Sequence, residues 1–263
     1  MMARPSLALL AAFLLALWAT ATLAAPDPAP RDVVIDWAVP ITMRDGVKLN
    51  ANIYRPAAGP ARLPVVLTIT PYTIDTLHED GNFFASHGYV YVAVDTRGRG
   101  GSQGDFMPTT HEAADGVDTI DWIAHQSFSD GRVVMWGGSY AGRNQLVIAA
   151  QRPSALKAIA PAATGYYGVD RGMRANIPFP QQMTWMALVA GRTAHPNAYI
   201  DRNYWVGAMA ELAAGRTSFR HFDQLVDIAS QLWQANLAHP MFDAYWMNTT
   251  GDASALTARR KAT

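Results

Sequence analysis

Short, uninterrupted apolar runs, bounded by prolines, glycines or charged residues, recur along the first part of the chain. Their lack of polar–apolar alternation is typical of strands in a parallel sheet that is covered on both faces. Four such runs, the last of them weaker, are predicted as strands: residues 64–70, 89–95, 133–136 and 156–160.

Segments with helical spacing separate these runs. Between the second and third strands, the segment from His111 to Gln126 has apolar residues on one face: Ala113, Val117, Ile120 and Ala124. Its acidic residues fall on another face, near the positive N-terminal end of the helix: Glu112, Asp115 and Asp118. Strands that alternate with such helices predict an α/β fold with a mostly parallel sheet and flanking helices.

Both ends of this alternating region have a different pattern. Val33 to Met43 alternates loosely, and Lys48 to Tyr54 resumes after the turn Arg44-Asp45-Gly46, which predicts a hairpin at the sheet edge. Residues 168–262 have helical spacing and no clear strand, so we expect a helical insertion over the sheet's C-terminal edge. Its tryptophans are expected to pack between helices: Trp185, Trp205, Trp233 and Trp246.

The most specific chemical signal is residues 133–142, Val-Val-Met-Trp-Gly-Gly-Ser-Tyr-Ala-Gly, followed by a helical pattern. This order of strand, tight turn and helix places Ser139 at the apex, with small residues two positions before it (Gly137) and two after it (Ala141). Such a turn projects the hydroxyl above the sheet and directs the N–H of Tyr140 to where an oxyanion would form. The alternative is an ordinary turn in which Ser139 caps the helix.

Two loops after predicted strands are weaker candidates. Tyr72 follows the strand at 64–70, and its hydroxyl could serve as a second oxyanion donor, although by position alone it is an ordinary packed loop tyrosine. The glycine-rich residues 94–104 lack the Lys-Ser/Thr ending of a phosphate-binding loop, and no helix opens directly on them. We therefore expect a structural loop, with Arg97 in an ion pair.

Taken together, these motifs resemble the cocaine esterase and X-prolyl dipeptidyl peptidase family of serine hydrolases. The segments that carry the resemblance are Met43 to Leu49, Tyr54 to Pro56, Thr70 to Tyr72, Asp95 to Gly100, Asp118 to Ile123, Ser129 to Val133, Gly137 to Gly142 and Leu156 to Pro161. The resemblance implies an α/β-hydrolase fold with a helical cap. It also implies hydrolysis of an ester or amide through an acyl-enzyme on Ser139. The hydroxyl of Tyr72 and the N–H of Tyr140 would form the oxyanion hole, and neither a metal nor an organic cofactor is expected.

The base and the acid of the catalytic triad are not found where this resemblance would put them. A serine hydroxyl needs a base, and in this fold the acid and the histidine follow late strands after the serine. None of the seven histidines has that place. His239 and Asp243 could substitute, but they match a cap segment. We therefore expect a truncated hydrolase with impaired activity, or alternatively a non-catalytic exported protein that binds its ligand.

Composition and charge limit the other function classes. Lys and Arg number 21, Asp and Glu also number 21, and no cysteine is present. Neutrality argues against a nucleic-acid surface, and the missing cysteines exclude disulfides and cysteine-rich metal sites. The expected partner is a small-molecule ester or amide or a short peptide.

The first residues have the pattern of a secretory signal peptide: Arg4, an apolar run from Leu7 to Ala25, and small residues near its end. We expect cleavage and a secreted or periplasmic protein without a membrane partner; an uncleaved anchor is the alternative. The predicted domains are a signal peptide (1–24), a Pro-rich spacer (25–32), the N-terminal part of the hydrolase core (33–165), a helical cap (166–250) and a tail foreign to the family (251–263).

Overall fold

The computed structural model describes residues 30–108, 110–164, 173–174, 177–178, 181–195, 200–228, 230–241 and 243–245. The predicted signal peptide, most of the spacer, Trp246 and the predicted tail lie outside these residues. No helix in the described ranges has the length and apolarity needed to cross a membrane.

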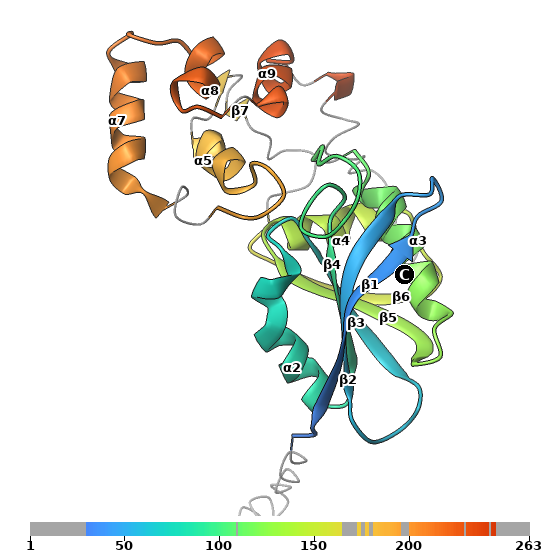
Figure 1. Cartoon of the computed structure of the whole chain (residues 1–263). Coiled ribbons are helices and arrows are strands. Elements are labelled where there is room, and N and C mark those ends of the chain that lie inside the picture. Colours follow the sequence, from blue (N-terminus) through green and yellow to red (C-terminus); the bar gives the residue numbers. More distant parts are fainter. Residues whose placement is uncertain are drawn as a thin grey trace, which may run out of the picture. The chain divides into compact units, whose positions relative to one another are not determined.

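A six-stranded mixed sheet forms the centre of the described fold (Figure 1). Its order is β1-β2-β4-β3-β5-β6. β2 pairs antiparallel with both β1 and β4, and the strands from β4 to β6 in this order are parallel to one another. The strands are β1 (Val33–Thr42), β2 (Lys48–Pro56), β3 (Leu63–Thr70), β4 (Val90–Asp95), β5 (Ser129–Gly138) and β6 (Leu156–Ala162). All four apolar runs are therefore strands, and the predicted hairpin lies at the edge as β1 and β2.

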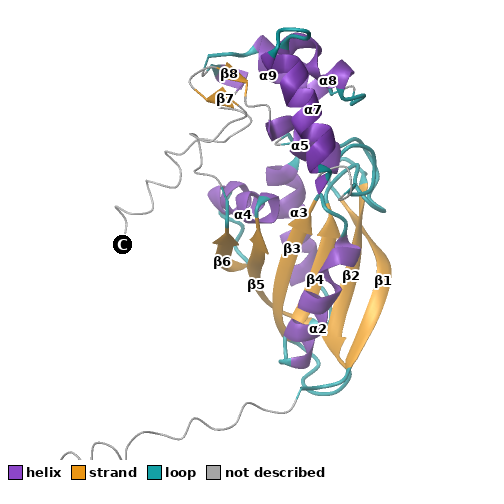
Figure 2. Cartoon of the chain, turned by 90° about the vertical axis from the view of Figure 1, so that its left-hand side faces the viewer, coloured by secondary structure: helices purple, strands orange, loops and turns teal. Residues whose placement is uncertain are grey.

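Helices cover both faces of the sheet (Figure 2). Helix α2 (His78–Ser86), which follows the short 3-10 helix η1 (Ile74–Leu77), packs on β2 and β4. Helices α3 (Glu112–Ala124) and α4 (Tyr140–Ala150) pack together on the other side, against β5 and β6. Two separate apolar clusters result, one including Tyr54, Tyr91 and Ala85, the other including Leu67, Ile120 and Ile148. This explains why the central strands lack alternation.

The strand order places a topological switch point between β3 and β5. After β3 the chain passes to α2 on one face, and after β5 it passes to α4 on the other face. In open α/β sheets the carboxyl ends of two such strands frame the position where ligands bind. The loops that begin at Pro71 and Ser139 therefore meet at this edge.

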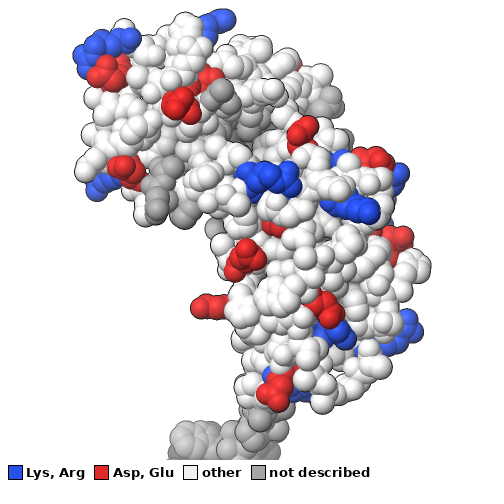
Figure 3. All heavy atoms as spheres, in the orientation of Figure 1, with Lys and Arg blue, Asp and Glu red and all other residues white. Residues whose placement is uncertain are grey.

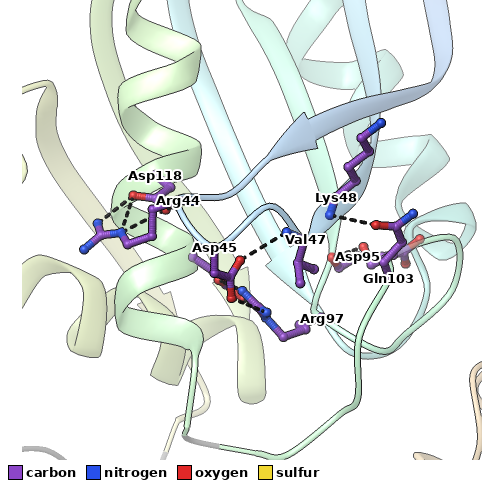
Figure 4. A network of polar contacts seen from close by, with 10 residues as sticks. Arg44, Asp45, Val47, Lys48, Asp95, Arg97, Gln103 and Asp118 are labelled. Atoms are coloured by element: carbon purple, nitrogen blue, oxygen red, sulfur yellow. Dashed lines mark hydrogen bonds and ion pairs between the residues drawn. The ribbon is translucent and has the colours of Figure 1, made fainter.

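The acidic face of α3 is partly buried. Ile120 is buried as expected, but Val117 is only partly buried, while Glu112 and Asp115 are buried. The reason is that both carboxylates have buried polar partners. The guanidinium of Arg97 donates two hydrogen bonds to Asp115, at 2.6 and 3.0 Å. It donates one more to Asp45, at 2.7 Å (Figure 4). The predicted ion pair of Arg97 is thereby confirmed.

After β6, helices predominate as predicted. They are α5 (Gln181–Leu188), α7 (Arg202–Ala213), α8 (Phe222–Leu225), which follows η2 (Phe219–His221), and α9 (Gln231–Ala238). Trp205 and Trp233 lie in the apolar core of this helical segment, as expected. The expectation of no strand is wrong, because β7 (Met173–Arg174) and β8 (Ile177–Pro178) form a short antiparallel pair.

The Arg97–Asp115 pair gives a stability prediction. The side chains are only 10% and 7% exposed, so removing the cation leaves a buried, unpaired carboxylate. We expect Arg97→Met to lower the free energy of unfolding by about 3–5 kcal/mol, measured by urea denaturation. The control is Arg132→Met, because Arg132 bonds Asp130 at the surface with 63% of its side chain exposed. That variant should lose at most about 1 kcal/mol. Similar losses in both variants would contradict the prediction.

A second prediction concerns acid stability. Arg44 hydrogen-bonds the Asp118 carboxylate and thereby holds the pKa of Asp118 below its ordinary value of 3.8 (Figure 4). The stabilisation is thus present above pH 3.8 and disappears as the pH falls through the lowered pKa. Asp118→Asn should cost about 0.5–1 kcal/mol at pH 7 and progressively less below pH 3.8. Chemical denaturation at several pH values measures this.

The matched control for this experiment is Asp121→Asn. Asp121 lies on the same helix, and its side chain is 77% exposed. It should stay within about 0.5 kcal/mol of the wild type. A difference between wild type and Asp118→Asn that does not change with pH would argue against the ion pair as its source.

Candidate active site

Ser139 occupies a sharp turn between strand β5 and helix α4. The strand ends at Gly138 and the helix begins at Tyr140, so one residue makes the whole change of direction. Its backbone is in the left-handed region, with φ 56° and ψ −122°. The N–H of Ser139 donates to the carbonyl of Ala162 at 2.9 Å, and its side chain makes no capping hydrogen bond. Ser139 is exposed, and its hydroxyl does not bond the N–H groups at the start of the helix. The side chain therefore does not act as the helix cap that the alternative interpretation required.

The residues around Ser139 must be small, because the neighbouring atoms leave no room for a Cβ at two of these positions. A Cβ on Gly137, which has φ 141°, would lie 2.8 Å from the Cβ of Ala141. One on Gly142 would lie 2.8 Å from the carbonyl oxygen of Ala162. Strand, helix and neighbouring strand therefore approach each other too closely for larger side chains.

The structure brings the predicted oxyanion donor Tyr72 to Ser139. The phenolic oxygen lies 3.1 Å from Ser139 Oγ, which is hydrogen-bonding distance, although the residues are 67 positions apart. The side chain of Tyr72 is half-buried. In the described part of the chain, the phenolic oxygen has one other partner, the indole N–H of Trp185, at 3.1 Å.

A buried carboxylate fixes the loop that carries Tyr72. Asp95, at the end of β4, accepts hydrogen bonds from the N–H of Ile74 at 3.0 Å and the N–H of Gly101 at 3.1 Å. Burial raises the pKa of Asp95 above its ordinary value. A side chain on Gly100 would collide with this carboxylate, which explains a glycine there. Asp95 thus joins the Tyr72 loop to the glycine-rich loop.

Arg99 is a structural residue that sequence reasoning missed. Its side chain is fully buried, and burial lowers the pKa of the guanidinium to about 10. Nε donates to the carbonyl of Pro71 at 2.8 Å, and Nη1 donates to the carbonyls of Val189, at 2.7 Å, and Gly191. An arginine inside a glycine-rich loop gives no sequence signal for such a role. It connects the Tyr72 loop with the end of α5.

Tyr140, the third predicted site residue, begins α4. As the first helical residue, its N–H has no carbonyl within the helix to bond to. Its side chain is buried, and its hydroxyl donates to Glu112. The ring stacks on Trp185, with centroids 5.8 Å apart and planes 8° from parallel.

His239 and Asp243 bond each other, with 2.7 Å between Nδ1 and Oδ2. The ring of His239 stacks on Tyr245. Over the described ranges, the Ser139 hydroxyl has no histidine partner, and Tyr72 provides its one side-chain hydrogen bond. The described residues also hold no cluster of three or more potential metal ligands. Charged side chains of both signs are interspersed on the face shown in Figure 3.

Comparison with known proteins supports the resemblance. A model of the X-Pro dipeptidyl-peptidase family (S15 family) matches residues 45–262. The chain belongs to this family. The cocaine esterase of Rhodococcus sp. (strain MB1 Bresler) is 41% identical over 131 residues, which are 47% of this chain and 22% of that enzyme.

Two solved structures resemble the described fold. An α-amino acid ester hydrolase is 26% identical with a TM-score of 0.67, over 88% of this chain and 42% of that one. An aminopeptidase from the marine sediment archaeon Thaumarchaeota archaeon is 27% identical with a TM-score of 0.63, over 84% and 40%. The mixed sheet with flanking helices is therefore an α/β-hydrolase fold, as predicted. The chain spans less than half the length of these relatives.

The geometry of the Ser139 turn predicts the effect of a single methyl group. Gly137→Ala places a Cβ against Ala141 and forces an unfavourable φ. It should lower the free energy of unfolding by about 1–3 kcal/mol, measured by denaturant titration. Gly207→Ala is the control, because a Cβ there meets nothing within 4 Å inside α7. This control should be neutral or stabilising by up to about 1 kcal/mol. Equal stability of both variants would contradict the crowded turn.

Proposed function

We propose that this chain provides the nucleophile and the oxyanion-binding residues of an exported serine hydrolase. The observation that carries the proposal is the 3.1 Å contact between Ser139 Oγ and Tyr72 Oη at the carboxyl ends of β3 and β5. An exposed hydroxyl on a strained turn, next to a phenolic donor, suits acyl transfer. Membership of the S15 family supports the same chemistry.

In the proposed reaction, Ser139 Oγ attacks the carbonyl carbon of an ester or amide and loses its proton to a base. The carbonyl oxygen becomes an oxyanion, which accepts hydrogen bonds from the Tyr72 hydroxyl and the Tyr140 N–H. As the intermediate collapses, the bond to the leaving group breaks and the protonated base gives its proton to that group, which departs as the alcohol or amine. Water then hydrolyses the acyl-enzyme, releases the acid and restores the Ser139 hydroxyl. Both donors are fixed before the substrate arrives, so little reorganisation is needed.

The base is the unassigned part of this mechanism. No histidine of the described ranges reaches Ser139, and His239 is bonded to Asp243. We therefore propose that turnover by this 263-residue chain is slow. In serine hydrolases that lose triad members, residual catalysis of about 10³–10⁴ over water remains from the oxyanion hole and substrate binding.

The proposed substrates are small esters or amides, or short peptides. The relatives include an esterase, an amino acid ester hydrolase and an aminopeptidase, and esters and peptides both present an acyl carbonyl. Export is proposed from the pattern of residues 1–24 alone. N-terminal sequencing of the protein from the producing cell tests it, with a start near Ala25 expected.

The proposed nucleophile is tested with a fluorophosphonate probe and mass spectrometry of the digested protein. We expect one covalent adduct, located on Ser139 and lost in Ser139→Ala. Tyr72→Phe should label roughly 10²-fold more slowly, because one oxyanion donor is removed.

The control is Ser218→Ala, which removes an exposed hydroxyl in the helical segment and should leave labelling unchanged. If Ser139 is not labelled, or is labelled no faster than other serines, the hydroxyl is not activated. That outcome would favour the alternative function, an exported protein that binds an acyl or peptide ligand without cleaving it.

A further inference from the structure

One indole of the helical segment contacts both proposed oxyanion donors. Nε1 of Trp185, on α5, donates to Tyr72 Oη at 3.1 Å. The face of the same ring stacks on Tyr140, the residue after Ser139. Packing between helices, which the sequence predicted for Trp185, does not require either contact.

We infer that Trp185 is a positioning residue that directs the hydroxyl proton of Tyr72 toward Ser139; this inference rests on the proposed function. An indole N–H can only donate, whereas a phenolic oxygen can donate one proton and also accept. Tyr72 must therefore be the acceptor in its bond with Trp185. Its own proton is left for Ser139 Oγ, the other partner of this oxygen in the described residues. When an oxyanion forms at this place, the same proton is already aimed at it.

Two sets of contacts fix the position of the Trp185 indole, one through Tyr140 and one through Arg99. On one side, Tyr140 is buried and its hydroxyl donates to the buried Glu112, so the ring beneath Trp185 has a defined place. The neighbours Met183 and Met186 anchor the same helix in the apolar core of the helical segment.

On the other side, Arg99 fixes the distance between donor and acceptor. Its guanidinium bonds the carbonyl of Pro71, next to Tyr72, and that of Val189, just after the end of α5. Because this group is planar and rigid, the Tyr72 loop and the helix that carries Trp185 are held at one separation. The indole–phenol hydrogen bond is thus part of a constrained arrangement.

Nuclear magnetic resonance tests the hydrogen bond without any need for activity. The protein has eight tryptophans, and the indole N–H signal of Trp185 is the one that Trp185→Phe removes. In Tyr72→Phe the indole loses its acceptor, so this signal should move upfield and exchange faster with solvent. Tyr89→Phe, which removes an exposed hydroxyl elsewhere, should leave it in place. An unchanged Trp185 signal in Tyr72→Phe would overturn the inference.

Phosphonylation rates separate positioning from a merely structural role. Trp185→Phe should slow labelling of Ser139 roughly 2- to 10-fold, the equivalent of one hydrogen bond. In a Tyr72→Phe background the same substitution should have no further effect, because there is no hydroxyl left to direct. A purely structural loss would instead slow labelling in both backgrounds.

Trp122→Phe is the control for loss of an indole, because Trp122 is a partly buried residue that packs on the sheet's apolar core. It should label at the wild-type rate. Additive effects of Trp185→Phe and Tyr72→Phe would overturn the positioning role. If the wild type does not label at all, the proposed function fails, while the resonance experiment still decides whether Trp185 directs the Tyr72 hydroxyl.

Discussion

The close approach of β5, α4 and β6 around Ser139 is the constraint on which the candidate site depends. The turn between strand and helix is one residue long, and the amide of that residue is tied to Ala162 on the neighbouring strand. These demands put Ser139 in the left-handed region and leave no space for a Cβ on Gly137. The strain is retained because the surrounding backbone determines the turn from several directions. Its consequence is an exposed hydroxyl at the carboxyl edge of the sheet.

Buried charges organise the loops around that turn, whereas apolar packing organises the sheet below them. Asp95 and Arg99 each bond backbone groups of two segments that are far apart in sequence. Arg97 pairs with Asp115 of α3 and with Asp45 in the turn between β1 and β2. A buried charge without partners is costly, so a loop that supplied fewer partners would be disfavoured. These loops are therefore held to each other and to the sheet by buried polar contacts.

The sequence predicted the features that have local signals and missed those that depend on tertiary contacts. Apolar runs identified the central strands, and small residues around Ser139 identified the turn. Helix α2 was missed because it contains Gly81, and glycine is a poor helix former. The glycine is needed there because a Cβ would lie 2.7 Å from the ring of Tyr54. The pair of β7 and β8 is two residues long on each strand, too short for any alternation. The burial of Asp115 on α3 could not be predicted, because an aspartate in a helix reads as a surface residue until Arg97 is known to face it.

Tyr72 and Trp185 show the same limit within the candidate site. By its position in the sequence alone, Tyr72 is an ordinary loop tyrosine, and only the family resemblance assigned it to the oxyanion hole. The order β4-β3-β5 brings it to a serine 67 residues away. Trp185 has the helical spacing of a core residue and is indeed partly packed in the core of its segment. Hydrophobic periodicity predicts that an aromatic ring is buried, but it carries no information on where the polar edge of the ring points. That direction is set by a partner 113 residues earlier, so the chemistry of this site depends on contacts between the helical segment and the sheet.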